Sequence, residues 1–265
     1  MIKTIITGVC GRMGSMILKL ALEDPDFMVS GVTEIEHHPS VGKCAEAVIV
    51  GAGNALIVEG NLASVIDRGD VVIDFTEPEA TLENFRLVKK KAKAIVIGTT
   101  GLKGQGLDEI MKTKNTRIVI SPNMSVGMNL MFDVVEKLSK KMKDHYDIEI
   151  FEMHHKLKKD APSGTAVKLK DLIKNAAPDR KWIEVFGRQG MLGERKKEEL
   201  GIMSLRGGDV VGEHTVMFAG IGERLEITHR AFSRENFARG ALVAARWLVK
   251  QKPGVYTMKD VLGLG

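Results

Sequence analysis

The feature that most constrains the fold is a glycine-rich turn near the N-terminus, placed between an expected strand and an expected helix. Residues 2–7 are mostly β-branched, which favours an extended strand. The turn that follows them reads Gly8-Val9-Cys10-Gly11-Arg12-Met13-Gly14. Beyond it, apolar residues recur at helical spacing, at Met16, Ile17, Leu20 and Ala21. A strand, a turn and a helix in this order are typical of a parallel α/β sheet.

The same alternation continues through the first half of the chain. Four further apolar stretches end in polar turn residues, at 27–33, 70–75, 94–97 and 117–120. Between the later strands, the spacing of apolar residues predicts helices over 80–91 and 107–112. We therefore expect an α/β protein whose first part is a Rossmann-like parallel sheet.

The pattern changes after Asn123. Residues 126–143 have the spacing of one long amphipathic helix, and the strands expected after it are longer and alternate polar with apolar residues, at 146–153, 201–206, 210–219 and 225–231. They predict an α+β second part with a mostly antiparallel sheet. Residues 236–250 again have helical spacing, and we expect them to pack back onto the first part. A chain of 265 residues is at the size where one core divides. We predict domains at 1–124, with 232–265 returning to the first, and at 125–231.

Composition excludes several classes of protein. The longest apolar runs, such as Val71-Val72-Ile73, are far shorter than the roughly 18 residues that cross a bilayer, so no membrane span is expected. The first strand runs directly into the glycine turn and leaves no room for a signal peptide, which predicts a cytoplasmic location. Cys10 and Cys44 are expected to be free thiols. The basic runs 89–93 and 195–197 lack interleaved aromatic residues, so nucleic-acid binding is not expected.

The glycine turn is a candidate site for the pyrophosphate of a dinucleotide. Backbone without side chains can approach a pyrophosphate, whose charge is stabilised by free N–H groups at the start of the next helix. The spacing departs from the usual G-x-G-x-x-G, because Gly11 and Gly14 match its last two positions while Val9 occupies the first. The alternative is a tight turn without a ligand. The predicted contacts are Gly8, Val9, Cys10, Gly11, Arg12 and Met13.

An acid at the end of the second expected strand supports the nucleotide hypothesis. Glu34 lies twenty residues beyond Gly14, where a carboxylate can accept hydrogen bonds from the adenosine ribose. The alternative is a solvated strand end. A 2′-phosphate needs a cation beside this acid, but Ile35 follows it, so of the two cofactors NADH and NADPH the sequence favours NADH. Other side chains could serve a 2′-phosphate and keep the choice open: Arg12, His37, His38 and Lys43.

Two later strand ends should face the same crevice, near the nicotinamide. They are Gly98-Thr99-Thr100 and Ser121-Pro122-Asn123-Met124. The alternative is that they are plain turns.

The densest polar cluster covers residues 149–166, which end a strand and begin a helix. The product of a hydride addition to a conjugated imine must be protonated, and His or Lys is a suitable acid, so His154 and Lys158 are catalytic candidates. The N–H groups at the start of the helix at Ser163-Gly164-Thr165 could hold a carboxylate. A surface cluster with a structural role is the alternative.

A metal site is an alternative interpretation of the two adjacent histidines. Neighbouring histidines on an extended chain point to opposite faces, so His154 and His155 cannot easily reach one ion. The spacing is also not H-E-x-x-H. We predict no metal.

The cluster resembles a family signature over its whole length. E-x-x-E-x-H-H-x-x-K-x-D-x-P-S-G-T-A is similar to the signature of the 4-hydroxy-tetrahydrodipicolinate reductases, with no departure. Further similarity spans nearly the whole chain, in Arg12-Met13-Gly14, Asp74-Phe75-Thr76, Gly98-Thr99-Thr100-Gly101, Asn123 with Ser125-Val126-Gly127, Gly212-Glu213-His214 and Gly222-Glu223-Arg224.

The resemblance implies an activity, an assembly and residue roles. The activity is reduction of (2S,4S)-4-hydroxy-2,3,4,5-tetrahydrodipicolinate, a small dicarboxylate, to tetrahydrodipicolinate with loss of water, using NADH or NADPH. The assembly is a homotetramer built through the second domain, which also binds substrate. His154 would be the proton donor and acceptor, Lys158 the proton donor, and His155, Gly164 and Thr165 the substrate contacts. The glycine turn, Glu34 and the two strand-end loops would bind the nucleotide. Ile35 departs from the basic residue that NADPH-using relatives tend to carry.

Two rival hypotheses remain. A nucleotide-sensing module without turnover would explain the glycines but not the cluster around His154 and Lys158. A semialdehyde dehydrogenase would need a cysteine nucleophile beside a base, whereas Cys10 and Cys44 both lie in the expected nucleotide half.

Overall fold

A computed structural model describes residues 1–47, 49–52 and 55–264. The chain forms two compact units, one of residues 1–126 with 234–265 and one of residues 127–233. The predicted domain ranges 1–124 and 232–265 include residues 48, 53, 54 and 265, which lie outside the described residues. The described helices include none long and apolar enough to cross a bilayer.

The first unit is built on a parallel sheet of seven strands, ordered β12-β6-β5-β4-β1-β2-β3. Every pair in it is parallel, which confirms the Rossmann-like prediction. The strands are β1 Ile2–Thr7, β2 Phe27–Thr33, β3 Val58–Glu59, β4 Val71–Asp74, β5 Ala94–Ile97, β6 Arg117–Ile120 and β12 Gly254–Tyr256. The short strands β3 and β12 were not predicted from the sequence.

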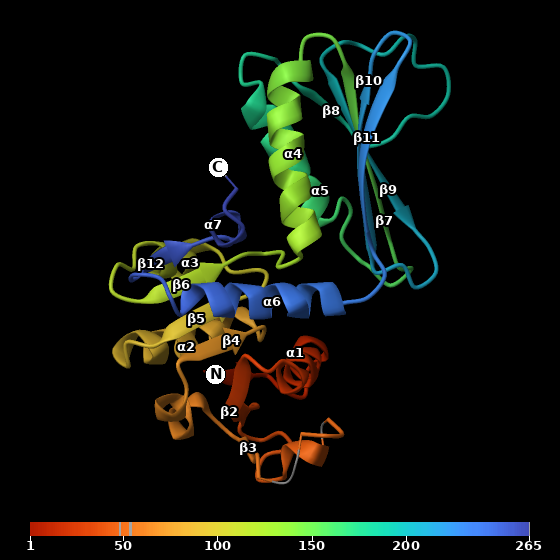
Figure 1. The fold of residues 1–265 in the computed structure, drawn as a ribbon. Helices are drawn as coiled ribbons and strands as arrows, with labels where there is room; N and C mark the ends of the chain where they lie inside the picture. The colour runs from red at the N-terminus through yellow and green to blue at the C-terminus, as the bar shows by residue number, and fades with distance from the viewer. Residues whose placement is uncertain (48, 53–54, 265) are drawn as a thin grey trace. The chain divides into compact units, whose positions relative to one another are not determined.

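Helices cover both faces of this sheet (Figure 1). They are α1 Arg12–Glu23, α2 Pro78–Lys90, α3 Gly104–Met111, α6 Glu235–Leu248 and α7 Met258–Val261, with short 3₁₀ helices at Ala45–Ala47, Leu62–Ser64 and Ile66–Arg68. Successive strand residues enter different cores, because side chains alternate across a strand. Ile6 packs with α1 and α6, while Ile5 packs with α2 and α3. This is why the central strands are continuously apolar.

The C-terminal segment completes the first unit. Helix α6 is rich in small residues, and a Cβ on Gly240 would overlap the carbonyl of Met124. The backbone of α6 therefore lies directly against the backbone of Met124. After it, β12 pairs with β6 at the edge of the sheet.

The second unit has a mixed sheet of five strands, ordered β11-β10-β7-β9-β8. The strands are β7 Asp147–His154, β8 Ile183–Val185, β9 Glu199–Arg206, β10 Gly212–Ala219 and β11 Arg224–Ala231. Strand β10 pairs antiparallel with β11 along its whole length and with β7 from Glu213 to Ala219, which confirms the predicted sheet. The sequence did not reveal that β9 runs parallel to β7 and β8.

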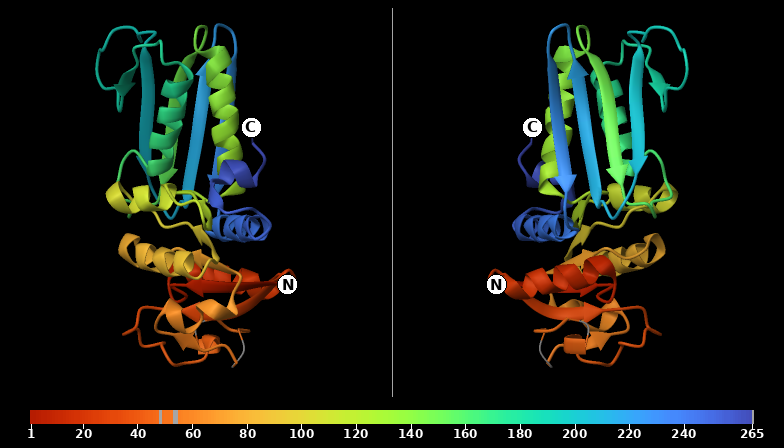
Figure 2. Two further views of the ribbon diagram at one scale, coloured as in Figure 1. Left: turned by 90° about the vertical axis from the view of Figure 1, so that its left-hand side faces the viewer. Right: turned by 90° about the vertical axis from the view of Figure 1, so that its right-hand side faces the viewer.

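The helices α4 Val126–Met142 and α5 Gly164–Ala176 cover one face of this sheet (Figures 1 and 2). Their apolar residues pack with Ile148, Ile150, Val216 and Phe218 in one core. Among the described residues, no helix covers the opposite face, which we call the outer face. The strand registers bring five apolar residues together on it, namely Phe151, Met153, Met203, Leu205 and Met217.

Candidate active site

The glycine turn between β1 and α1 forms a narrow backbone cradle. Gly8 has φ of 62°, which side chains rarely permit. A Cβ on Gly14 would overlap the carbonyl of Gly8, so only glycine fits there. Gly11 precedes α1 without a side-chain cap, and the first turn of the helix carries no acidic residue. A phosphate group fits a turn of this kind, because helix N–H groups face it and no side chain competes for them.

Glu34 lies against this turn. Its Oε2 accepts a hydrogen bond from the Cys10 N–H at 2.9 Å, and its Oε1 accepts one from the Ile35 N–H at 2.9 Å. The carboxylate is thus fixed beside the cradle at the end of β2. Burial, together with Glu34, raises the pKa of the Cys10 thiol. A protonated thiol is a poor nucleophile, which disfavours the semialdehyde dehydrogenase hypothesis.

The predicted strand-end loops follow β5 and β6, at the same carboxyl edge of the sheet as Gly8 and Glu34. A Cβ on Gly98 would overlap the ring of Phe75, so the loop after β5 lies tightly against the loop after β4. In the loop after β6, the Ser121 hydroxyl donates to the Asn123 carbonyl at 2.8 Å. The residues predicted to contact the nucleotide therefore all lie along the carboxyl edge of the parallel sheet.

Asp74 organises this edge, and sequence reasoning assigned it no role. The carboxylate is fully buried at the end of β4 and accepts five hydrogen bonds. The donors are the Thr76 N–H and hydroxyl, the Thr81 and Thr99 hydroxyls and the Asn84 amide. Asp74 therefore ties the loop after β4 to the loop after β5 and to α2.

Replacing Asp74 by alanine should destabilise the first unit by about 3 kcal/mol, because buried donors lose a charged acceptor. Urea unfolding, followed by Trp247 fluorescence in a Trp182→Phe background, measures this loss. Asp67 is a matched control, since its side chain is 70% exposed and pairs only at the surface with Lys91. Equal losses in the Asp74→Ala and Asp67→Ala variants would contradict the assignment.

The second unit brings His154 into a buried polar cluster at the end of β7. Its Nδ1 lies 2.6 Å from Glu152 Oε2, and Arg206 makes two hydrogen bonds to the same carboxylate at 2.9 Å each. Ser163 donates its N–H to Glu152 Oε1 at 3.1 Å, and its hydroxyl lies 3.0 Å from His214 Nε2. The rings of His154 and His214 meet edge to face with centroids 5.2 Å apart. Every side chain of this cluster is therefore held by another member.

The other predicted residues follow in the chain. Lys158 lies in a turn closed by its N–H to the His155 carbonyl at 3.1 Å, and its Nζ pairs with Asp160 at 2.9 Å. His155 Nδ1 is buried and has no hydrogen-bond partner among the described residues. Gly164 and Thr165 open α5, which Ser163 caps by accepting the Ala166 N–H at 3.2 Å. A Cβ on Gly164 would meet only open space.

Sequence reasoning gave no role in the site to Glu152, Arg206 or His214. The spacing E-x-H was a usable signal for Glu152, because residues two apart on a strand share a face. Arg206 and His214 come from β9 and β10, and only strand register places them opposite His154 and Glu152. Within the described ranges, no group of three His, Cys, Asp or Glu side chains is arranged to hold a metal.

Two pKa values in the cluster are strongly shifted. Burial raises the pKa of Glu152, but hydrogen bonds from His154, Arg206 and Ser204 outweigh it and lower the pKa to about 2. Burial, followed by the charge on His154, lowers the pKa of His214 to about 3. Near neutral pH the site thus contains an ionised carboxylate beside a neutral imidazole.

The His214 shift predicts how stability depends on pH. The folded chain keeps His214 neutral, whereas the unfolded chain protonates it below its ordinary pKa of 6.5. Its contribution is complete above pH 6.5 and declines as the pH falls toward 3, with about 3 kcal/mol lost by about pH 4. A His214→Gln variant should lack this loss. Urea unfolding at several pH values, read from Trp182 in a Trp247→Phe background, compares them, and parallel curves would refute the prediction.

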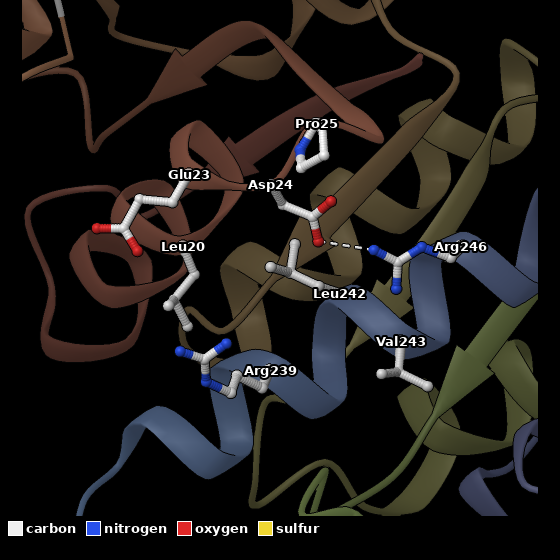
Figure 3. Close-up of a pocket in the computed structure, with 8 residues that line it drawn as sticks. All are labelled: Leu20, Glu23, Asp24, Pro25, Arg239, Leu242, Val243 and Arg246. Atoms are coloured by element: carbon white, nitrogen blue, oxygen red, sulfur yellow. Dashed lines mark hydrogen bonds and ion pairs between the residues drawn. The ribbon is translucent and has the colours of Figure 1, made fainter.

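A surface hollow of about 430 Å³ lies elsewhere, between the end of α1 and α6 (Figure 3). Its lining includes Leu20, Leu242 and the ion pair of Arg246 with Asp24 at 2.6 Å. It contains none of the predicted site residues. Helix α1 runs away from the glycine turn, so its end lies at the opposite edge of the sheet.

Comparisons with known proteins match both units. Residues 2–124 match the family model for the N-terminus of dihydrodipicolinate reductase, and residues 127–262 match the model for its C-terminus. The chain is 44% identical to the 4-hydroxy-tetrahydrodipicolinate reductase of Syntrophus aciditrophicus over 99% of each chain. It is 46% identical to that of Syntrophobacter fumaroxidans over 100% of each. Among solved structures, it is similar to a dipicolinate-bound dihydrodipicolinate reductase from Paenisporosarcina, with a TM-score of 0.79 and 26% identity over 99% of this chain and 100% of that one.

Proposed function

Because the chain belongs to the dihydrodipicolinate reductase family, we propose that it reduces (2S,4S)-4-hydroxy-2,3,4,5-tetrahydrodipicolinate to tetrahydrodipicolinate in lysine and diaminopimelate biosynthesis. The observation that carries this proposal is the cluster at the end of β7, where His154 and Lys158 precede the start of α5. In addition, the chain is similar over its full length to two relatives named 4-hydroxy-tetrahydrodipicolinate reductase.

The reaction consumes one hydride and one proton and releases one water. A bound NADH or NADPH supplies the hydride. In this chain, His154 is proposed to donate and accept the proton, and Lys158 to donate one. The ion pair of Lys158 with Asp160 supports this role, because it holds the ammonium group within the turn that follows His154. Removal of the hydroxyl as water needs a proton donor of this type.

The substrate carboxylates are proposed to bind His155, Gly164 and Thr165. The first N–H groups of α5 favour an anion, and its first turn carries no acidic residue. Because Gly164 carries no side chain and faces open space, a carboxylate can approach the backbone there.

The nucleotide is proposed to contact residues 8–13, Glu34, residues 98–100 and residues 121–124. NADH should be preferred, because a 2′-phosphate beside Glu34 would meet a like charge. One such repulsion is worth about 1 kcal/mol, so kcat/KM should favour NADH by about fivefold. Steady-state assays with both nucleotides measure the ratio. Ile35→Arg should reverse the preference, since Ile35 is 71% exposed and tolerates a longer side chain. A wild-type preference for NADPH would contradict the assignment.

A homotetramer is proposed to form through the outer face of the second unit. Phe151 and Leu205 there are 36% and 49% exposed, and their strand partners Met203 and Met153 extend the apolar surface. Such a surface favours burial against another copy of the chain. A cytoplasmic location remains part of the proposal.

The function is tested by a coupled assay with freshly generated substrate, following the loss of absorbance of the reduced nicotinamide ring. Substrate-dependent oxidation with formation of tetrahydrodipicolinate supports the proposal. Tight binding of NADH without turnover would overturn it in favour of a nucleotide-sensing module.

A further inference from the structure

We propose that Glu152 is a positioning residue: clamped by Arg206, it holds His154 as the tautomer with a proton on Nδ1 and so turns Nε2 toward the substrate. The inference deepens the proposed function and rests on it. The reaction does not consume Glu152.

The first observation is that both oxygens of the Glu152 carboxylate are hydrogen-bonded. Oε2 accepts from Arg206 at 2.9 Å and lies 2.6 Å from His154 Nδ1. Oε1 accepts from Arg206 at 2.9 Å and from the Ser163 N–H at 3.1 Å. The side chain is fully buried. An ionised carboxylate can only accept, so His154 must donate from Nδ1.

The second observation concerns the other ring nitrogen. A Cβ on Gly212 would lie 3.0 Å from His154 Nε2, so the absence of a side chain at this position leaves space beside that nitrogen. The Nε2 of His214 is engaged elsewhere, 3.0 Å from the Ser163 hydroxyl. Nε2 of His154 is thus the nitrogen available for proton transfer.

The third observation is that Arg206 connects the two catalytic candidates. Besides clamping Glu152, it donates to the Asp160 carbonyl at 2.6 Å. Asp160 is the ion-pair partner of Lys158. The Arg206 guanidinium therefore fixes Glu152, which accepts from His154. It also fixes the backbone of Asp160, the ion-pair partner of Lys158.

Glu152→Gln tests the proposal because it preserves shape while adding a donor. If the new NH₂ group replaces Oε1, it meets two donors, from Arg206 and Ser163. If it replaces Oε2, it meets one donor of Arg206 and can donate to His154 Nδ1. Only the second arrangement places the new NH₂ group against His154 Nδ1, which can accept once the imidazole proton moves to Nε2.

The matched control is Glu149→Gln. Glu149 lies on the same strand, is also buried, and is paired with Arg188 and Arg195 at 2.9 Å each. It faces the outer side of the sheet and has no contact with His154. The control therefore loses a comparable ion-pair network without touching the proposed tautomer.

The experiment combines histidine ¹⁵N NMR at about pH 8 with steady-state kinetics, with the His154 signals assigned from a His154→Gln sample. Wild type should show protonated Nδ1 and bare Nε2, and Glu152→Gln the reverse. In Glu152→Gln, kcat should fall at least about 100-fold with the substrate KM changed less than about threefold, since a misplaced imidazole proton costs up to about 10⁴-fold in a serine protease. Glu149→Gln should match wild type in both measurements.

Three results would overturn the inference: protonated Nε2 in the wild-type spectrum, an unchanged tautomer with unchanged kcat in Glu152→Gln, or an equal loss of kcat in a Glu149→Gln protein that assembles as wild type does. The wild-type spectrum tests the proposal even if Glu152→Gln fails to fold. The tautomer is read without turnover, so a wild-type protein that lacks reductase activity refutes the proposed function and leaves the positioning result standing by itself.

Discussion

Lys158→Ala is expected to lower kcat by about 10²- to 10⁴-fold, the usual contribution of a general acid. The nucleotide Kd should change less than about twofold, because Lys158 lies in the second unit, whereas the glycine turn lies in the first. Its side chain is 21% exposed and pairs with Asp160, so the loss of this surface pair should cost little stability. Steady-state kinetics and nucleotide titration measure the two quantities on one sample.

Lys158→Arg separates proton transfer from charge. Arginine keeps the positive charge but does not release a proton near neutral pH, so this variant should lose nearly as much kcat as Lys158→Ala. Lys159→Ala, which removes the exposed neighbouring lysine, should behave as wild type. An active Lys158→Arg variant would show that the side chain only attracts the anion.

Gly14→Ala is expected to weaken nucleotide binding by about 10²- to 10⁴-fold. The added Cβ would overlap the Gly8 carbonyl and lie 2.9 Å from Val9 Cα, and both are backbone atoms that cannot rotate away. The turn must therefore open. Two lost hydrogen bonds to a charged group, at about 1.5 to 3 kcal/mol each, account for the expected range. Isothermal titration with NADH measures the change.

Gly187→Ala is the matched control for that variant. Its Cβ would meet no atom within 4 Å, and its backbone needs no positive φ. Its affinity for NADH should equal that of wild type. A Gly14→Ala protein that is folded and binds NADH normally would exclude the turn as the nucleotide site.

The fold was predictable where periodicity was strong. The central strands and α1 were visible as apolar patterns with clear turns, because both faces of the sheet are buried. The two-residue strand β3 and the edge strand β12 carry too few residues for a period to appear. The parallel pairing of β7 with β9 was hidden because strand partners distant in sequence leave no local signal.

The cluster at the end of β7 was predictable only where its residues are neighbours in sequence. His154, Lys158 and Gly164 fall within one segment that ends a strand and starts a helix. Arg206 reaches Glu152 across 54 positions, and Thr99 reaches Asp74 across 25, so these contacts exist only after the sheets form. Buried polar groups need partners, but the sequence does not say which ones.

The return of α6 and β12 to the first unit has a consequence for biosynthesis of the chain. A ribosome completes residues 127–233 before it has made α6, which together with α1 covers one face of the parallel sheet. We therefore expect the second unit to reach its native state first. The strands of the first unit should stay partly exposed until α6 has left the ribosome. For this chain the order of folding would run against the order of translation.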